Sequence, residues 1–394
     1  MDRKPLRENT STAEAMSKSG YGVMIEQILK EKMTGLPAIL LVTLICLFAG
    51  LDCKREPPIV PPTPPPPSHP TVTWIADTIH NPYPDSQLTL TSIWGSDTND
   101  VYALGHNSEG GSASLYHYDG TKWSVVKITQ AEGGFIGSYI DLLNIDGSGK
   151  NDVWAVGSRG TPFYLNADSS LVIHYDGSAW KEVQMERCKD AMQNLKVVGP
   201  NDVYFGGSFG EVYHYDGSTF TKTVLDTNVN IALGGDDIRM YAGGTTYYLT
   251  YNPYVAVYSK LGDGPWQLIK KTSEADYYQY RTYGYLDFYS LGGGRYFSGG
   301  EGIYVLSDST WQLSYSADDY PYTRIRGTGP MNVFAISSFN RLLHWDGADW
   351  KLLNIPEGLG NNPVFGGGLW VKGNKIFISC LYGFDVNIIY RGTY

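Results

Sequence analysis

The sequence has few of the residues on which catalytic, metal and nucleic-acid sites depend. Its 394 residues include four cysteines and seven histidines, and only 18% are charged. The formal net charge is −10 and no basic stripe offsets it, so we do not expect nucleic acid as a partner. Long amphipathic helical patterns are also lacking. Aromatic residues make up 14% of the chain and glycine is abundant at 46 residues, which favours many short strands joined by turns.

Two short motifs recur along the chain. The first is HYDGTKW and its copies HYDGSAW, HYDGSTF and HWDGADW, at residues 117–123, 174–180, 214–220 and 344–350. The second is NDVYALG and its copies NDVWAVG and NDVYFGG, at residues 99–105, 151–157 and 201–207, with four weaker copies further along. The copies are spaced by roughly 37 to 55 residues, which is the period of four-stranded propeller blades.

These repeats predict an all-β fold, a seven-bladed β-propeller of four-stranded antiparallel blades. Each strong repeat contains four strand signals rich in β-branched and aromatic residues. A single blade would expose two apolar faces, so the ring of blades must close. Because four of the seven copies are weak, a propeller of six or eight blades remains an alternative.

The ends of the repeat region predict how the ring closes. The last repeat places Tyr390 where the first has Tyr118, so the chain ends before an outermost strand. TVTWIADTI, residues 71–79, matches the fourth strand of the first repeat, with Trp74 in the place of Trp123. We therefore expect residues 71–79 to complete the last blade.

The first 70 residues have a different composition. Residues 36–51 are an uncharged apolar run that ends in AGLDC, which resembles the lipobox of bacterial lipoproteins, although Asp52 replaces the usual small residue. The resemblance implies a lipid attached to Cys53, and a retained signal anchor is the alternative. Residues 56–70 are proline-rich and should form a stiff spacer. We predict a signal segment, an anchor with its linker, and a propeller at residues 1–52, 53–70 and 71–394.

The pattern WG...NDVWAVG...HYDGxxW resembles the repeats of seven-bladed propellers in exported bacterial lipoproteins. It is also similar to the repeats of Asp-box and kelch-type propellers. One difference is that Asp119 and Gly120 are adjacent in this sequence, whereas other residues separate the Asp and Gly of an Asp-box. The resemblance covers residues 71–394. It implies an envelope protein anchored to a bacterial membrane, on the periplasmic side or at the cell surface.

The repeated side chains are expected to be structural. The tryptophans should fill the wide outer gaps between blades, at Trp123, Trp180, Trp266, Trp311 and Trp350. The histidines should form local hydrogen bonds, because equivalent positions in different blades are too far apart to share an ion: His117, His174, His214 and His344. His69 falls in the linker. We find no phosphate-loop, calcium-loop or nucleophile-elbow motif, and we predict neither a metal nor a cofactor.

The connections from second to third strands, and from each blade to the next, are long and irregular. In a propeller they share one face, and loops on a rigid scaffold commonly carry binding sites. Tyrosine and arginine gather there, which suits contact with protein or sugar. The expected ligand contacts are Arg159, Tyr164, Tyr247, Tyr278, Tyr280, Arg281, Tyr320 and Tyr322.

Three functions follow from these features. We favour a monomeric, lipid-anchored binding module without enzymatic activity, which recognises a protein or a glycan. A carbohydrate-active enzyme is the second hypothesis, and it requires Arg159, Arg281 and Arg324 to converge at the centre of the ring beside a pair of carboxylates. An envelope assembly scaffold is the third.

Overall fold

A computed structural model shows the fold of this chain. The described residues are 68–81, 87–107, 115–128, 140–159, 169–186, 191–246, 253–272, 283–316, 321–337, 341–355, 364–382 and 386–394. They belong to one compact unit, Pro66–Tyr394. Within these described segments, no helix has the length and apolar character needed to span a membrane.

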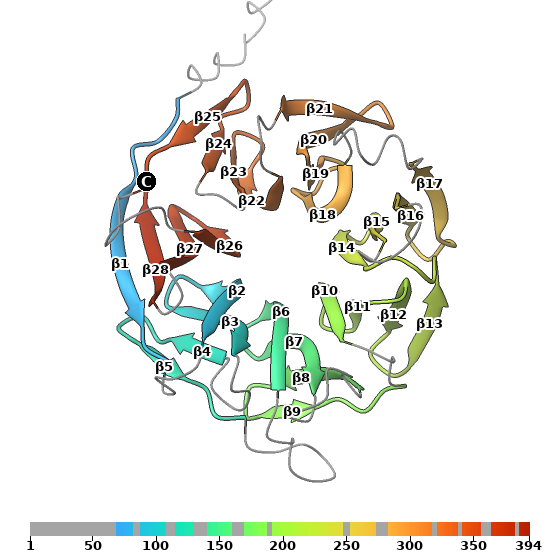
Figure 1. Ribbon diagram of the computed structural model, residues 1–394, viewed down its shortest axis with the longest axis horizontal. Coiled ribbons are helices and arrows are strands. Elements are labelled where there is room, and N and C mark those ends of the chain that lie inside the picture. Colours follow the sequence, from blue (N-terminus) through green and yellow to red (C-terminus); the bar gives the residue numbers. More distant parts are fainter. Residues whose placement is uncertain are drawn as a thin grey trace, which may run out of the picture. The chain divides into compact units, whose positions relative to one another are not determined.

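Seven four-stranded antiparallel sheets surround a central axis, which confirms the predicted seven-bladed propeller (Figure 1). Each blade runs from an innermost first strand to an outermost fourth strand. Blade 1 contains β2 (Leu88–Asp97), β3 (Asp100–Asn107), β4 (Leu115–Tyr118) and β5 (Trp123–Val125). Blade 2 contains β6 (Ile140–Gly149), β7 (Asp152–Arg159), β8 (Ser169–Tyr175) and β9 (Trp180–Glu182). Blade 3 contains β10 (Met192–Gly199), β11 (Asp202–Gly207), β12 (Glu211–Tyr215) and β13 (Phe220–Val224).

The remaining blades follow the same order, except at the end of the chain. Blade 4 contains β14 (Ala232–Gly235), β15 (Arg239–Thr245), β16 (Val255–Leu261) and β17 (Gln267–Lys271). Blade 5 contains β18 (Tyr283–Ser290), β19 (Tyr296–Gly300), β20 (Gly302–Ser307) and β21 (Thr310–Ser316). Blade 6 contains β22 (Tyr322–Gly329), β23 (Asn332–Ser337), β24 (Leu342–Trp345) and β25 (Trp350–Leu353). Blade 7 contains β26 (Val364–Lys372), β27 (Lys375–Tyr382), β28 (Val386–Thr393) and, as its outermost strand, β1 (Thr73–Ile79).

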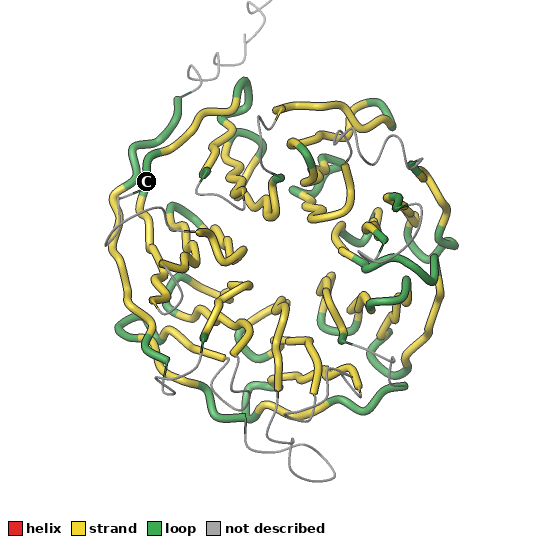
Figure 2. The backbone as a smooth tube through the Cα atoms, in the orientation of Figure 1, coloured by secondary structure: helices red, strands yellow, loops and turns green. Residues whose placement is uncertain are grey.

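The two ends of the repeat region meet in blade 7, which confirms the predicted closure. β1 pairs antiparallel with β28 along its whole length, and it runs along the outer rim of the ring (Figure 2). Trp74 stands opposite Gly392 in this pairing, just as Trp123 stands opposite Tyr118 in blade 1. A strand from the start of the chain therefore holds its last blade in place.

One detail of the predicted closure was wrong. Gly392, and not Tyr390, occupies the place of Tyr118, because Gly392 pairs with Ile376 of β27 and with Trp74 of β1. β28 is eight residues long and continues past Tyr390 to Thr393. Its pairing with β1 is therefore shifted by two residues from the alignment expected from the sequence.

Aromatic rings from the outermost strands or the turns just before them fill the gaps between blades, as the repeated tryptophans predict. Trp180 of blade 2 lies edge-on to Tyr102 of blade 1, with 5.7 Å between ring centroids. The same contact joins later blades at Trp266–Tyr204, Trp311–Tyr241 and Trp350–Phe297. Blades diverge with distance from the axis, so the rim needs the largest side chains.

The Asp-Gly turns connect third to fourth strands as expected. Asp119 Oδ1 accepts a hydrogen bond from the Thr121 hydroxyl, and 2.9 Å bonds from the backbone N–H groups of Thr121 and Lys122. These bonds lower the pKa of Asp119 to about 2. Gly120 follows with a φ of 93°, which side chains other than glycine rarely tolerate.

The repeated histidines of blades 1 to 3 have the predicted structural role. Each places Nε2 2.7 Å from a carboxylate oxygen of the aspartate in the NDV motif of its own blade, in the pairs His117–Asp100, His174–Asp152 and His214–Asp202. Each ring also stacks on the aromatic residue opposite, as His214 does on Tyr204 with centroids 4.2 Å apart. Blade 6 differs, because His344 Nε2 faces the amide oxygen of Asn332 at 2.9 Å.

Candidate binding site in the central cavity

The two ends of the blades differ. First-to-second and third-to-fourth turns are short and form what we call the short-turn face. Second-to-third and blade-to-blade connections form the loop face, which is not uniformly long, since only Glu301 separates β19 from β20. Most of the predicted ligand contacts lie outside the described residues, namely Tyr164, Tyr247, Tyr278, Tyr280, Arg281 and Tyr320. Cys53 and Cys188 also lie outside them, whereas Cys380 is a buried free thiol.

Arg159 and Tyr322 are the predicted contacts that the structure describes, and neither is a free surface group. Arg159 ends β7 and forms an ion pair with Glu182 of β9, the outermost strand of the same blade. Tyr322 begins β22 and is 0% exposed, in a cluster with Phe297 and Ile325 between blades 5 and 6. The first residue of this inner strand therefore packs against the neighbouring blade instead of facing solvent.

A cavity of about 200 Å³ is lined by the innermost strands of all seven blades. On β2 and β6 the middle residues of the lining, Ile93 and Ile145, also pack into the cores between blades, whereas the residues on either side of them differ from blade to blade. Equivalent positions form two rings. The ring nearer the loop face contains Ser92, Asn144, Asn194, Asp287 and Arg324. The ring nearer the short-turn face contains Trp94, Asp146, Lys196, Tyr289, Arg326 and Trp370.

Short polar side chains in these rings join each blade to the next. Innermost strands have an edge without a partner strand, so their backbone N–H groups need other acceptors. Side-chain oxygens of these ring residues accept from the next blade in four places: Ser92 from Ile145 N at 3.4 Å, Asp146 from Val197 N at 2.9 Å, Asn194 from Leu233 N at 3.2 Å, and Asp287 from Ile325 N at 2.7 Å. Both aspartates of the cavity are therefore part of the scaffold.

Both aspartates also neutralise a cation. Asp287, which is 4% exposed, accepts a 2.8 Å bond from the Arg326 guanidinium, and Asp146 pairs with Lys196 at 3.0 Å. Burial opposes the charge of Arg326, but Asp287 outweighs it and raises the pKa of Arg326. These two pairs leave the cavity with one further cation.

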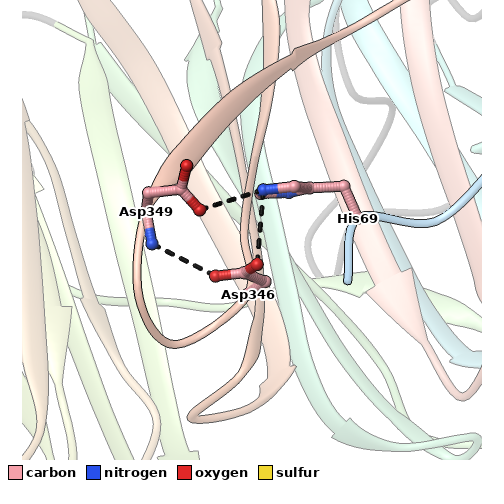
Figure 3. A group of neighbouring side chains, drawn as sticks. All are labelled: His69, Asp346 and Asp349. Atoms are coloured by element: carbon pink, nitrogen blue, oxygen red, sulfur yellow. Dashed lines mark hydrogen bonds and ion pairs between the residues drawn. The ribbon is translucent and has the colours of Figure 1, made fainter. Parts of the chain in front are cut away.

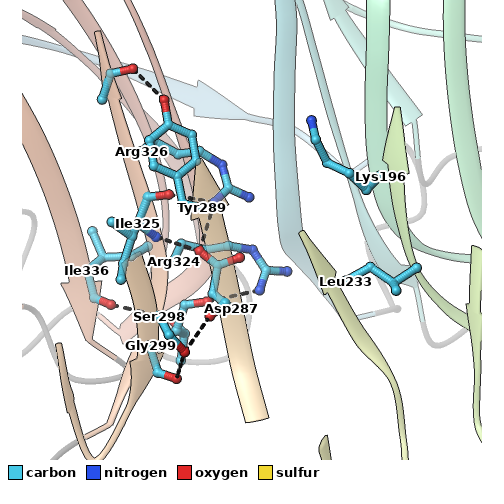
Figure 4. Close-up of polar contacts among 12 residues, drawn as sticks. Lys196, Leu233, Asp287, Tyr289, Ser298, Gly299, Arg324, Ile325, Arg326 and Ile336 are labelled. Atoms are coloured by element: carbon cyan, nitrogen blue, oxygen red, sulfur yellow. Dashed lines mark hydrogen bonds and ion pairs between the residues drawn. The ribbon is translucent and has the colours of Figure 1, made fainter. Parts of the chain in front are cut away.

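That cation is Arg324. Its guanidinium extends into the middle of the ring, toward the side occupied by Lys196 and Leu233 (Figure 4). One amine donates to the Thr323 carbonyl at 2.9 Å, and no carboxylate of the described segments lies within 4.0 Å of it. Burial lowers the pKa of Arg324. Its remaining N–H donors form a planar fork suited to a carboxylate or another oxyanion.

The described geometry does not match the carbohydrate-enzyme hypothesis. That hypothesis needed Arg159 and Arg324 to converge. Arg159, at the end of β7, is instead paired with Glu182 of the outermost strand of its blade, whereas Arg324 lines the central cavity. Asp146 and Asp287 are engaged by cations and backbone N–H groups, which leaves them poorly suited to act as an acid and a nucleophile. Arg281 lies outside the described residues.

Comparisons with known proteins support the fold. No family model matches the chain, and no curated protein matches it. Among solved structures, it is similar to YCF48 bound to D1 peptide, with 14% identity, a TM-score of 0.56, and coverage of 82% of this chain and 95% of that one. YCF48 from Cyanidioschyzon merolae has 12% identity and a TM-score of 0.51, covering 81% and 98%. U3-55K has 12% identity and a TM-score of 0.55, also covering 81% and 98%. At such identities the likeness concerns the propeller architecture of this chain.

Proposed function

We propose that this chain is an exported, lipid-anchored binding module that recognises a protein through its loop face and the cavity beneath it. Arg324 carries the proposal, because it is a partly buried guanidinium without a carboxylate partner among the described residues. It is the third residue of β22, whose first residue lies at the loop face. An acidic group of the partner would enter the cavity there and pair with it.

The surroundings of Arg324 favour the binding of one carboxylate from a partner molecule over an ion pair within the chain. The other two cations of the cavity are already neutralised by Asp146 and Asp287. Trp94 and Trp370 supply an apolar wall in the ring below. One cation without a carboxylate partner among the described residues, in a small volume, suits one acidic side chain or a chain terminus held by a forked hydrogen bond. The bound peptide in the YCF48 structure adds that a propeller of similar architecture can take a peptide ligand.

A panning experiment with a random peptide library on immobilised full-length protein tests the proposal. Enriched peptides should contain Asp, Glu or a free terminal carboxylate. The substitution Arg324→Ala should weaken their binding at least tenfold, and Arg324→Lys should restore part of it, because a lysine keeps the charge but not the fork. Arg295→Ala is the matched control, since Arg295 is exposed and its guanidinium donates to the Pro330 carbonyl, away from the cavity.

Two results would reject this function. Enriched peptides that bind the Arg324→Ala variant as tightly as the parent would exclude the cavity as their site. Binding of acidic glycans on an array, with no enrichment from the peptide library, would replace the protein partner by a sugar.

Export and lipid attachment rest on residues 36–53, where an apolar run ends at Cys53. Metabolic labelling with a fatty-acid analogue tests them. The parent chain should incorporate the label and fractionate with membranes, and the Cys53→Ser variant should not be labelled. Labelling that survives in Cys53→Ser, or a parent chain that carries no label, would reject the anchor.

A further inference from the structure

His69 lies on the propeller body, beside the turn between β24 and β25 of blade 6 (Figure 3). Its Nε2 atom is 3.3 Å from Asp346 Oδ2 and 3.1 Å from Asp349 Oδ1. The three atoms all lie within 4.8 Å of one another. Sequence reasoning placed His69 in the linker, so this group of three side chains was not expected.

The turn in blade 6 differs from the equivalent turns of blades 1 to 3. Asn332 replaces the aspartate that binds the repeated histidine in those blades. Asp349 stands where the other turns have Lys122, Ala179 and Thr219. Ala348 stands where they have Thr121, Ser178 and Ser218, whose hydroxyls bond the turn aspartate. All three departures occur in the one blade that His69 contacts.

The hydrogen bonds around His344 determine which nitrogen of His69 carries a proton. Asn332 Nδ2 donates to Thr328 Oγ1 and Tyr394 Oη, so its Oδ1 must accept from His344 Nε2–H. His344 is 2% exposed. Its Nδ1 then accepts from Nδ1–H of His69, 3.1 Å away. With Nδ1–H donating to His344, Nε2 faces two carboxylates: either it carries a second proton, or its lone pair binds a cation held between them.

The distances also differ from those of the other histidine–aspartate pairs. His117, His174 and His214 each lie 2.7 Å from a single carboxylate oxygen, as expected for a charge-assisted hydrogen bond. His69 instead faces two oxygens at 3.1 and 3.3 Å. A tetrahedral metal ion with ligands at about 2.0–2.1 Å separates those ligands by about 3.3 Å. The spacing around His69 is close to that value.

Asp346 is prepared for such a role. Its Oδ1 accepts the backbone N–H groups of Ala348 and Asp349, at 2.9 and 3.1 Å, which leaves Oδ2 directed at His69. The carboxylate is 3% exposed.

We propose that His69 Nε2, Asp346 Oδ2 and Asp349 Oδ1 bind one Zn²⁺ ion, with water as a fourth ligand. An imidazole with two carboxylates suits zinc, whereas calcium and magnesium take oxygen ligands. The hydrogen bond from Nδ1 of His69 to His344 is the support that metal-binding imidazoles usually have. The ion would fasten the segment before β1 to blade 6, and so reinforce the closure of the ring.

Zinc binding by the full-length protein, stripped with a chelator and titrated in competition with a chromogenic chelator, tests the site. The parent should bind one Zn²⁺, and His69→Ala and Asp349→Asn should each weaken binding at least tenfold. His106→Ala is the matched control, because His106 Nδ1 also lies 3.0 Å from a carboxylate oxygen, that of Asp141. It should bind Zn²⁺ as the parent does.

Two further readouts separate ligation from folding. Co²⁺ should give the visible absorption of a tetrahedral site in the parent and in His106→Ala, but not in His69→Ala. Zn²⁺ should raise the Tm of the parent and leave that of His69→Ala unchanged. A parent without Zn²⁺ binding, an affinity equal in His69→Ala, or tighter binding of Ca²⁺ than of Zn²⁺ would overturn the proposal and leave His69 as a protonated ion-pair partner.

Discussion

The carboxylate of Asp77 on the closing strand receives the Arg391 guanidinium of β28 through both of its oxygens. The same carboxylate accepts a 3.0 Å hydrogen bond from the Trp123 indole of blade 1. Arg391 also donates to the Tyr118 hydroxyl at 2.9 Å and lies over its ring. One side chain of β1 is therefore bound to blade 7 and to blade 1, on both sides of the junction that closes the ring.

Removal of this carboxylate should destabilise the whole propeller. We expect Asp77→Ala to lower the free energy of unfolding by about 1–3 kcal/mol, because it leaves the largely buried Arg391 guanidinium without its carboxylate and the Trp123 indole N–H without its acceptor. A double-mutant cycle with Arg391→Ala, followed by denaturant unfolding, measures the coupling. Lys181→Ala removes a more exposed ion pair with Asp176 and should cost well under 1 kcal/mol. If Asp77→Ala and Lys181→Ala lowered the free energy of unfolding equally, the proposed role of Asp77 in ring closure would be contradicted.

Deletion of the closing strand should abolish cooperative unfolding. A chain that begins at residue 80 loses all seven pairs between β1 and β28 and exposes an apolar edge of blade 7. A chain that begins at residue 66 keeps them and serves as the control. Calorimetry should show a sharp transition for the control and none for the shorter chain. A transition of similar Tm and enthalpy in both would mean that the ring does not depend on β1.

The tryptophans between blades should contribute strongly to stability. Trp180 is 7% exposed and contacts Tyr102 across the gap between blades 1 and 2. We expect Trp180→Ala to cost about 3–5 kcal/mol, because it leaves a large cavity, and Trp180→Phe to cost clearly less. Denaturant midpoints of the two variants provide the measurement. A cost below about 1 kcal/mol for the alanine variant would show that Trp180 does not fill that gap.

The aspartates of the turns should make stability depend on pH in acid. The pKa of Asp119 is about 2 in the folded chain and 3.8 in its unfolded reference, so the unfolded chain binds more protons between these values. The stabilisation is complete above pH 3.8 and is lost as pH falls toward 2. Asp119→Asn keeps the acceptor oxygen but removes the titration. Unfolding free energies from pH 5 to 3 should therefore fall less steeply in this variant than in the parent, and identical slopes would contradict the assignment.

The blades and their closure could be predicted because the same local chemistry recurs. Asp-Gly turns, NDV motifs and outer aromatic residues specify each blade separately, and Trp74 marks the displaced strand by its similarity to Trp123. The register of β28 was missed by two residues, since no repeated side chain marks that position. Blade 5 has no strong motif, so the contribution of Asp287 to the cavity had no visible signal.

Contacts between distant segments could not be derived from the repeats. His69 meets Asp346 only because closure brings the start of the propeller beside blade 6. The departures at Asn332, Ala348 and Asp349 were visible in the sequence, but their common partner was not. Likewise, the sequence singled out Arg324 as one of three arginines that the carbohydrate-enzyme hypothesis needed to converge. Its position beside Asp287 in one ring of the cavity, with Arg326 in the next ring, became visible only in the structure. A buried Tyr322 was mistaken for a loop residue because the boundary of β22 could not be located to within one residue.

The most direct test of protein recognition by the loop face is photocrosslinking in the cells that make this protein. A photoreactive amino acid would be placed on the loop face at His106 or Glu186, and on the short-turn face at Lys122 or Thr219. We predict a defined protein adduct from the first pair of positions and none from the second, with the adduct lost when Arg324→Ala is added. An adduct formed from the short-turn face, or one that persists in the Arg324→Ala background, would contradict this prediction.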